Sequence, residues 1–293
     1  MEKYKISFIN RSLPGYGAYE TVMHYHKEAM NRGFDSNINL IDDTVDFYII
    51  NMLYGDDEKK LKEILHPNKF VYIEHSIECV LPEKTWIRDF VMPNSFRNYF
   101  FSLRHRNHIL DAFSVENKIL ASDNYDYLVV PVDYNIFKPN PEITRDENLN
   151  IFVGMIHTNK GVDTILTMAI KNPHKEFLFI GTLEGGDKSE EDFVGASNVK
   201  YIGHISKNKL VEYYNKASTL YLLPTNGAVE SAGRVVFEAV LCGCNVVVNS
   251  DVGNASYPWY NDATKIIENI DISIEKLFNT IMEGCRRASK QDG

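Results

Sequence analysis

The chain has 293 residues, of which 44% are hydrophobic and 24% charged, and this composition is typical of a globular protein with one large domain or two ordinary ones. The formal net charge of −9 argues against general binding to nucleic acids, whose phosphates attract basic surfaces. No apolar run approaches the length of about 18 residues that a membrane span needs, and the first residues lack the apolar core of a signal peptide.

The cysteines lack the CxxC and zinc-ligand spacings of a redox or metal site. We therefore interpret them as reduced thiols of a cytoplasmic protein, and we expect two of them to pack at the end of one helix. The four are Cys79, Cys242, Cys244 and Cys285, and the two at the helix end are Cys242 and Cys244.

Strand and helix patterns alternate along the first half of the chain, which predicts an α/β fold with a parallel sheet. Most predicted strands are continuous apolar runs, as expected when helices cover both faces of the sheet. The predicted strands are Lys5–Asn10, Asp46–Asn51, Phe70–Glu74, Phe90–Met92 and Tyr127–Val130. The predicted helices are Ala18–Arg32, which Gly33 ends, Asp56–Leu65, and a segment over Arg97–His108.

The segment Pro131–Asn148 holds three prolines and several charges without a helical period, so it predicts a domain boundary. We place the N-terminal domain at residues 1–134 and the C-terminal domain at residues 135–293. The predicted strands of the second domain are Asn150–Gly154, Phe177–Gly181, Val199–Ile202, Tyr221–Leu223, Val246–Val248 and Lys265–Ile267. Its predicted helices are Gly161–Lys171, a helix that Ser206 caps and that reaches Ala217, a helix from Gly233, and Ile272–Gly284.

The stretch Tyr221–Asp251 reads as strand, loop, helix and strand, and it carries two glutamates separated by seven residues. Glu230 lies in the loop before the helix, and Glu238 lies about two turns inside it. The residues between Glu230 and the start of the helix are small, so the backbone N–H groups there are open to a diphosphate. These small residues are Ser231, Ala232 and Gly233. Carboxylates beside them would accept hydrogen bonds from sugar or ribose hydroxyls.

Four segments of the sequence together resemble a GT-B glycosyltransferase, and more narrowly the family 4 retaining enzymes that use nucleotide-sugar donors. They are PVDYNIFKP, VGMIHTNKGVDTIL, VKYIGHISKNKLVEYYNKASTLYLLPT and ESAGRVVFEAVLCGCNVVVNSDVG. The resemblance is clearest over residues 128–255. It implies two Rossmann-like doubly wound domains that face a cleft, with the acceptor on the N-terminal side and the nucleotide-sugar donor on the C-terminal domain.

The resemblance also implies roles for residues of the second domain. Glu230 matches the glutamate at the donor sugar hydroxyls, and Glu238 matches the one that holds the nucleotide ribose. The backbone of Ser231–Gly233 matches the segment that meets the diphosphate. Lys160, in the sequence NKG, matches the lysine that neutralises the donor phosphate.

Three residues of the first domain match the family on the other side of the cleft. His75 matches a histidine near the transferred sugar. Gly15 and Gly17 match a glycine-rich first loop close to the diphosphate and the acceptor, although the sequence GYGAYE lacks the usual Gly-Gly pair.

The main departure from the family is Met155, which stands where the family usually has an arginine beside the donor phosphates. Arg234, at the start of the helix, and Arg11 are the candidates to replace that cation. A cation at a helix N-terminus opposes the helix dipole, which favours an anionic partner for Arg234.

These residues predict a metal-independent retaining transfer of a sugar from a nucleotide-diphosphate-sugar, with no cofactor, since no Asp-x-Asp motif accompanies the site. The acceptor would be a glycan, a lipid-linked molecule or a small molecule, and no nucleic acid. A degenerate protein that binds nucleotide sugars without turnover and a sugar-nucleotide epimerase remain alternatives. A Rossmann dehydrogenase is set aside, because GYGAYE lacks the third glycine of the dinucleotide fingerprint.

The segment Arg97–His108 carries three arginines and no acid. On a helix, Tyr99, Phe100 and Leu103 would form the buried side, which leaves the arginines as an ordinary solvated face. The alternative is that Arg97–Arg106 contact anionic lipid head groups, which would make the cytoplasmic protein peripheral to a membrane.

Overall fold

The computed structural model describes residues 3–52, 55–65, 69–75, 85–114, 124–183, 186–225 and 227–291, so Cys79 lies outside the described residues. The chain divides into two compact units, Met1–Pro131 with Asn269–Gly293, and Val132–Glu268. The division therefore follows Pro131, where the sequence placed it after residue 134. Residues 269–293, which the sequence assigned to the second domain, belong to the first unit.

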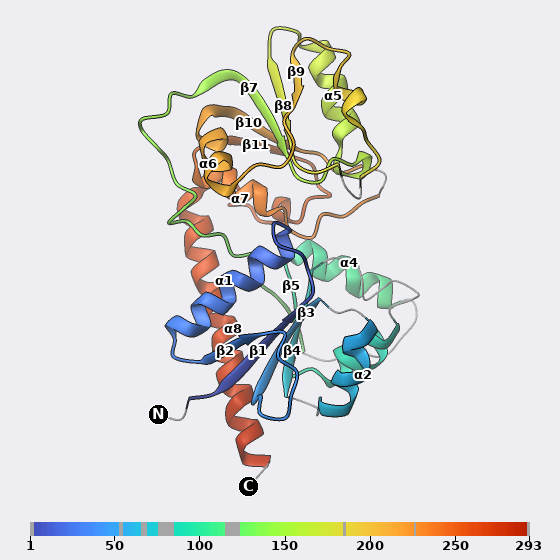
Figure 1. Ribbon diagram of the computed structural model, residues 1–293, viewed down its shortest axis with the longest axis vertical. Helices are drawn as coiled ribbons and strands as arrows, with labels where there is room; N and C mark the ends of the chain where they lie inside the picture. The colour runs from blue at the N-terminus through green and yellow to red at the C-terminus, as the bar shows by residue number, and fades with distance from the viewer. Residues whose placement is uncertain are drawn as a thin grey trace. The chain divides into compact units, whose positions relative to one another are not determined.

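The first unit is built on a six-stranded sheet of order β2-β1-β3-β4-β5-β6, in which every neighbouring pair is parallel (Figure 1). Its strands are β1 (Lys5–Asn10), β2 (Asp35–Ile38), β3 (Phe47–Met52), β4 (Phe70–Glu74), β5 (Arg97–Phe100) and β6 (Tyr125–Tyr127). Its helices are α1 (Gly17–Asn31), α2 (Gly55–Ile64), α3 (Met92–Asn94), α4 (Leu103–Ser114) and most of α8 (Ala263–Gln291).

Helices cover both faces of this sheet, with α1 and α8 on one face and α2 and α4 on the other (Figure 1). Successive strand residues point to opposite faces. Accordingly, Tyr48 packs with Leu61 of α2, whereas Phe47 meets Gly284 of α8. A methyl group at Gly284 would come within 2.2 Å of the Phe47 ring, so the close approach of α8 requires glycine there.

The second unit is built on a five-stranded parallel sheet of order β11-β10-β7-β8-β9 (Figure 1). Helix α5 lies on one face of this sheet, and α6 and α7 lie on the other (Figure 1). The strands are β7 (Asp146–Val153), β8 (Glu176–Ile180), β9 (Val199–Tyr201), β10 (Ala217–Leu222) and β11 (Asn245–Val248). The helices are α5 (Val162–Lys171), α6 (Lys207–Lys216) and α7 (Arg234–Leu241). The predicted Rossmann-like α/β class is confirmed for both sheets.

The helix predicted over Arg97–His108 is wrong, because the segment is strand β5 followed by helix α4. The aromatic run of this segment favours a strand, and Tyr99 and Phe100 are buried within the sheet. Arg97 therefore starts the strand, whereas Arg104 and Arg106 lie beyond its opposite end on α4. The expected helical face with three arginines, on which the predicted membrane contact depended, therefore does not form.

Three predicted strands need correction. Phe90–Met92 lies in a π-helical turn (Ile87–Val91) that runs into α3, where Pro93 occupies the first turn. Lys265–Ile267 is the start of α8, which Asp262 caps by accepting a hydrogen bond from the backbone N–H of Lys265 at 3.1 Å. Strand β6 ends at Tyr127, and beyond it the N–H of Val129 donates to the Ser273 hydroxyl at 2.9 Å.

Candidate functional site

The loops after β7 and β10 meet at the point where the strand order of the second sheet reverses. The chain runs from β7 outward through β8 and β9, and then returns to the other side of β7 to form β10 and β11. Open α/β sheets bind ligands at the carboxyl ends of their strands, at such a reversal. Lys160 follows β7 and Glu230 follows β10, so both lie beyond the carboxyl ends of the two strands at this reversal.

An ion pair joins these two residues, with the Nζ of Lys160 donating to Oε2 of Glu230. The Lys160 side chain is 36% exposed and that of Glu230 is 19% exposed, so water and ligands reach the pair. The sequence predicted that the two would share a site, and the structure brings them into direct contact.

The turn that carries Lys160 is fixed by its neighbours. Gly161 has a φ of +83°, and a Cβ atom on it would stand 1.9 Å from the carbonyl oxygen of Leu223. The N–H of Thr225 donates to the carbonyl of Asn159 at 3.1 Å, and the Thr225 hydroxyl donates to Thr158 at 3.0 Å. The loops after β7 and β10 are thus held together directly.

The loop after β8 holds the same turn from the other side. The carboxylate of Asp187 accepts a hydrogen bond from the N–H of Thr158 at 2.8 Å. This backbone hydrogen bond lowers the pKa of Asp187. Asp187 therefore supports the Lys160 turn, a role that no sequence pattern predicted.

The backbone of Glu230 is pinned by the segment after β11. Its N–H donates to the carbonyl of Asp251 at 2.9 Å, and its own carbonyl accepts from the N–H of Gly253 at 2.7 Å. These bonds form a parallel bridge between Glu230 and Val252, which extends the sheet beyond β10. The carboxylate is consequently presented from a rigid position.

The start of α7 is capped by a residue distant in sequence. The N–H of Gly233 donates to the side-chain oxygen of Asn254 at 2.7 Å, and Asn254 is fully buried. Of the three small residues expected to offer N–H groups to a diphosphate, Gly233 therefore already has a partner. Ser231 is largely buried, and Ala232 is half-buried.

Glu238 and Arg234 form an ion pair on one face of α7. Arg234 Nη2 lies 3.2 Å from Glu238 Oε1, and the exposed fractions of the two side chains are 11% and 8%. The second oxygen of Glu238 accepts a hydrogen bond from the Tyr214 hydroxyl at 3.1 Å. Each of the two predicted glutamates thus contacts a residue that was predicted as a phosphate cation.

The low-dielectric surroundings of Glu238 change the acidity of its neighbours. Burial and then the Glu238 charge raise the pKa of Tyr214 well above its usual value, so its hydroxyl remains a donor. The same two causes raise the pKa of Cys242 to about 12. Cys242 and Cys244 are both buried at the end of α7, as predicted.

The predicted residues of the first unit lie at the carboxyl ends of its strands. His75 directly follows β4, and its ring centroid lies 4.5 Å from that of Phe101. Gly15 has a φ of +90°, which favours glycine, and Gly17 is the first residue of α1. The side chain of Asn10 holds this loop, since it accepts from the N–H of Ser12 at 3.0 Å and donates to Ala18 at 3.2 Å.

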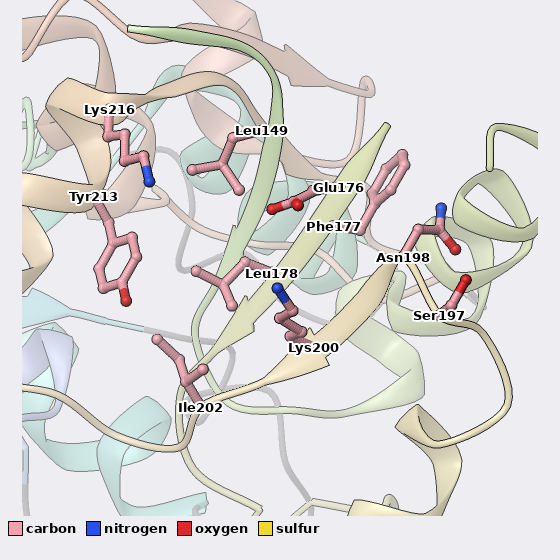
Figure 2. Close-up of a pocket in the computed structure, with 10 residues that line it drawn as sticks. All are labelled: Leu149, Glu176, Phe177, Leu178, Ser197, Asn198, Lys200, Ile202, Tyr213 and Lys216. Carbon is pink, nitrogen blue, oxygen red and sulfur yellow. The ribbon is translucent and has the colours of Figure 1, made fainter. Parts of the chain in front are cut away.

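A cavity of about 190 Å³ lies elsewhere in the second unit, towards the amino ends of β7, β8 and β9 (Figure 2). Leu149, Leu178 and Tyr213 are among the residues that line it. None of the predicted site residues lines this cavity, so it is separate from the candidate site at the carboxyl ends of β7 and β10.

The described residues form neither a metal site nor a membrane-spanning helix. No three His, Cys, Asp or Glu side chains gather there as ligands for a metal ion. No helix within the described ranges combines the length and the apolar character needed to cross a bilayer.

The sequence of residues 133–282, just over half of the chain, matches the family described as Glycosyl transferases group 1. The chain belongs to this family. No curated relative matches the sequence. The matched region contains the second unit almost entirely, together with the first turns of α8.

Solved structures share the fold of this glycosyltransferase at low sequence identity. Anabaena HepE in complex with UDP and glucose is 16% identical, with a TM-score of 0.62 and coverage of 98% of each chain. AviGT4, a glycosyltransferase involved in avilamycin A biosynthesis, is 14% identical, with a TM-score of 0.61 and coverage of 98% of this chain and 96% of that one. The fold is therefore that of a GT-B glycosyltransferase, as predicted.

A third similar structure is an alpha-glucosyltransferase in complex with UDP and a 13-mer DNA. It is 14% identical, with a TM-score of 0.63, and the match covers 99% of this chain and 95% of that one. The fold alone therefore does not exclude a nucleic acid as acceptor of a group 1 glycosyltransferase.

Sequence reasoning missed three residues that organise the site of this glycosyltransferase. Asp187, Tyr214 and Asn254 each bond a predicted element from another segment of the chain. None carries a strong sequence signal, since Asp187 lies in the loop after β8, Tyr214 lies within α6, and Asn254 lies in a short turn after β11. The contacts depend on how loops and helices pack, which no local pattern encodes.

Proposed function

We propose that the protein transfers a sugar from a nucleotide-diphosphate-sugar to an acceptor, with retention of anomeric configuration. The observation that supports this most strongly is the Lys160–Glu230 ion pair at the strand-order reversal of the second sheet. There a cation suited to phosphate and a carboxylate suited to sugar hydroxyls are held side by side. HepE, which shares the fold, was solved with UDP-glucose, and this favours a nucleotide-sugar donor here as well.

In the proposed reaction, the bond between the anomeric carbon and the diphosphate oxygen breaks, and the acceptor hydroxyl forms a bond to that carbon on the same face. The acceptor proton leaves with the departing diphosphate or to solvent. Negative charge develops on the diphosphate, and Lys160, Arg234 and the backbone of Ser231–Ala232 would stabilise it. Because two side-chain cations serve this charge, we propose that no metal ion is required.

Glu230 would bind hydroxyls of the donor sugar, and Glu238 would bind the ribose through lone pairs that Arg234 and Tyr214 leave available. For His75, Gly15 and Gly17, at the carboxyl ends of the strands of the first unit, the roles that the family resemblance implies remain part of this proposal. We propose a glycan, lipid-linked or small acceptor, because a net charge of −9 disfavours a nucleic acid. A cytoplasmic location remains a prediction of the sequence.

The proposal is tested by measuring the melting temperature with UDP-, GDP-, ADP- and dTDP-linked sugars. A donor that binds the native state raises the melting temperature by mass action. NMR of the product formed with an acceptor panel then gives the anomeric configuration. We expect one base to stabilise the protein and the product to keep the configuration of the donor; inversion would contradict retention, and the lack of any stabilisation would overturn the proposal.

A second function is favoured by one observation. Met155 follows Gly154 directly at the end of β7, so one side chain that the resemblance expects beside the phosphates carries no charge. If this loss abolishes turnover, the protein binds nucleotide sugars without using them. Calorimetric binding in the absence of hydrolysis or transfer would support that function, and a changed free nucleotide sugar would indicate an epimerase.

A further inference from the structure

The carboxylate of Glu238 is held from two sides by residues of two helices. Arg234, on the same helix, approaches one oxygen at 3.2 Å, and Tyr214, on α6, donates to the other at 3.1 Å. Glu238 itself is only 6% exposed. A carboxylate bonded through both oxygens cannot rotate without breaking one of the bonds, so its orientation is fixed.

Tyr214 is the innermost member of this chain of contacts. Its side chain is fully buried, and its ring packs edge-on against Phe137 with centroids 6.0 Å apart. The backbone carbonyl of Tyr214 also accepts a hydrogen bond from Arg145 at 3.4 Å. The hydroxyl therefore approaches Glu238 from a position that the core of the unit determines.

The Arg234–Glu238 pair is poorly placed for stabilising its own helix. Arg234 is the first residue of α7, where a positive charge opposes the helix dipole. An acid that precedes a base by four residues stabilises a helix better than the reverse order seen here. Both side chains are also nearly buried, and burial removes hydration that an ion pair replaces only in part. An anion at the helix start would favour this arrangement.

We propose that Tyr214 is a positioning residue, which acts through Glu238 to aim the guanidinium of Arg234 at the donor diphosphate. This inference rests on the proposed function, because it assumes that a diphosphate binds at the start of α7. Tyr214 does not touch the donor. It fixes Glu238, and Glu238 fixes Arg234, which then needs little ordering when phosphate oxygens arrive.

The test is calorimetry of the whole protein with UDP, GDP and ADP, followed by steady-state kinetics with the donor that binds. Tyr214→Phe removes one hydroxyl and keeps the buried ring. We expect the affinity for the nucleoside diphosphate to fall about three- to tenfold and the donor KM to rise by a similar factor. The acceptor KM should not change, which separates this role from a general loss of structure.

Tyr213→Phe is the matched control. Tyr213 is the preceding residue of α6, and its side chain lines the cavity at the amino ends of the strands (Figure 2). This variant also loses one hydroxyl, but none that contacts Glu238. It should bind the nucleoside diphosphate as the unaltered protein does, and the melting temperatures of both variants show whether either loses stability.

A double-mutant cycle identifies the residue through which Tyr214 acts. In an Arg234→Met background, Tyr214→Phe should change the affinity less than about twofold, because no guanidinium remains to be positioned. An undiminished effect in that background would overturn the proposal, as would an unchanged affinity of Tyr214→Phe alone. If the unaltered protein binds none of the three nucleotides, the proposed function itself fails and the inference falls with it.

Discussion

Lys160 and Glu230 neutralise each other at the ends of two adjacent strands, and both side chains remain partly exposed. Such a pair contributes roughly 0.2–1 kcal/mol, so a ligand can separate it at modest cost. A diphosphate would take Lys160 and leave Glu230 available for sugar hydroxyls. The ion pair is thus compatible with the proposed binding, in which the carboxylate would become available only once the phosphate has arrived.

This exchange predicts opposite effects of one substitution on binding and on catalysis. Glu230→Gln removes the charge that competes for Lys160, so the affinity for the bound nucleoside diphosphate should rise up to about fivefold. Transfer from the nucleotide sugar should fall at least about a hundredfold, because an interaction with the reacting sugar is lost. Calorimetry and initial-rate kinetics measure the two effects.

Glu212→Gln is the control for this substitution, since Glu212 forms an exposed ion pair with Lys209 on α6. The Glu212→Gln substitution should change neither the affinity for the nucleoside diphosphate nor the rate of transfer. A Glu230→Gln variant that binds the nucleotide more weakly would show that Glu230 assists diphosphate binding rather than competing with it.

The turn between β7 and α5 depends on a residue without a side chain. In Gly161→Ala the new Cβ would overlap the carbonyl oxygen of Leu223, at a backbone conformation that already disfavours alanine. We expect a loss of roughly 2–4 kcal/mol in the free energy of unfolding, measured by urea denaturation. Gly203→Ala is the comparison, because Gly203 has a φ of +72° but a Cβ atom on it would stand 3.9 Å from the nearest atom, the hydroxyl oxygen of Tyr201. That variant should lose only about 1–2 kcal/mol; equal losses would mean that the overlap at Leu223 is relieved easily.

Helix α8 completes the core of the first unit through one row of apolar side chains. Phe278 is 2% exposed, its ring centroid lies 5.9 Å from that of Phe34, and the Arg32 guanidinium lies 4.8 Å above it. Phe278→Ala should therefore lower the free energy of unfolding of this unit by about 3–5 kcal/mol. Amide hydrogen exchange locates the loss, which we expect in β1–β3 and α1 and not in the second unit.

Ile272→Ala on the same helix provides the contrast, because Ile272 is 61% exposed. Its effect should stay within about 0.5 kcal/mol. Faster exchange in the second unit of Phe278→Ala would show that the stability of the two units is coupled.

Strands and helices were predicted correctly where the apolar residues of the sequence mark them. Strands β1 and β4 are apolar runs at the centre of a sheet, and their predicted limits are those of the structure. Strand β2 has the sequence DSNI and lies at the sheet edge, so no apolar run marks it. The apolar pattern in the first turns of α8 is compatible with a strand or with a helix. Only the capping by Asp262 distinguishes the helix from a strand.

The part of the candidate site that lies at the ends of strands could be predicted from the sequence. The loops after β7 and β10 must meet when their strands are neighbours, so the proximity of Lys160 and Glu230 follows from topology. The contact between Tyr214 and Glu238 depends instead on how α6 and α7 pack over the sheet. No spacing in the sequence encodes that distance, and the same holds for Asn254 and Gly233.

At the scale of the whole molecule, the buried thiols and phenols cause the stability of the protein to fall as the pH rises in the alkaline range. Burial raises the pKa of Tyr99, Cys285 and Cys242 to about 12, and that of Cys244 to about 11. In the unfolded chain these groups ionise near their ordinary values of 10.0 for tyrosine and 9.0 for cysteine. The stability they contribute is complete below about pH 9 and is lost as the pH rises towards the folded-state values.

We therefore expect a melting temperature that is nearly constant from pH 7 to about pH 9 and then falls steeply, with about 1.4 kcal/mol lost per pH unit for each such group. Cys285→Ala should have a shallower decline, since one titrating group is removed. A decline of equal slope in that variant would show that Cys285 ionises without unfolding.

The assignment of residues 269–291 to the first unit has a consequence for biosynthesis. A ribosome releases the complete second unit, Val132–Glu268, before it releases the helix that the first unit still lacks. Although translated earlier, the first unit keeps the apolar surface around Phe34, Phe47 and Tyr99 uncovered until that helix emerges. The second unit can therefore finish folding before the first unit, although it is synthesised later. Until α8 emerges, the first unit is the one that needs protection from aggregation.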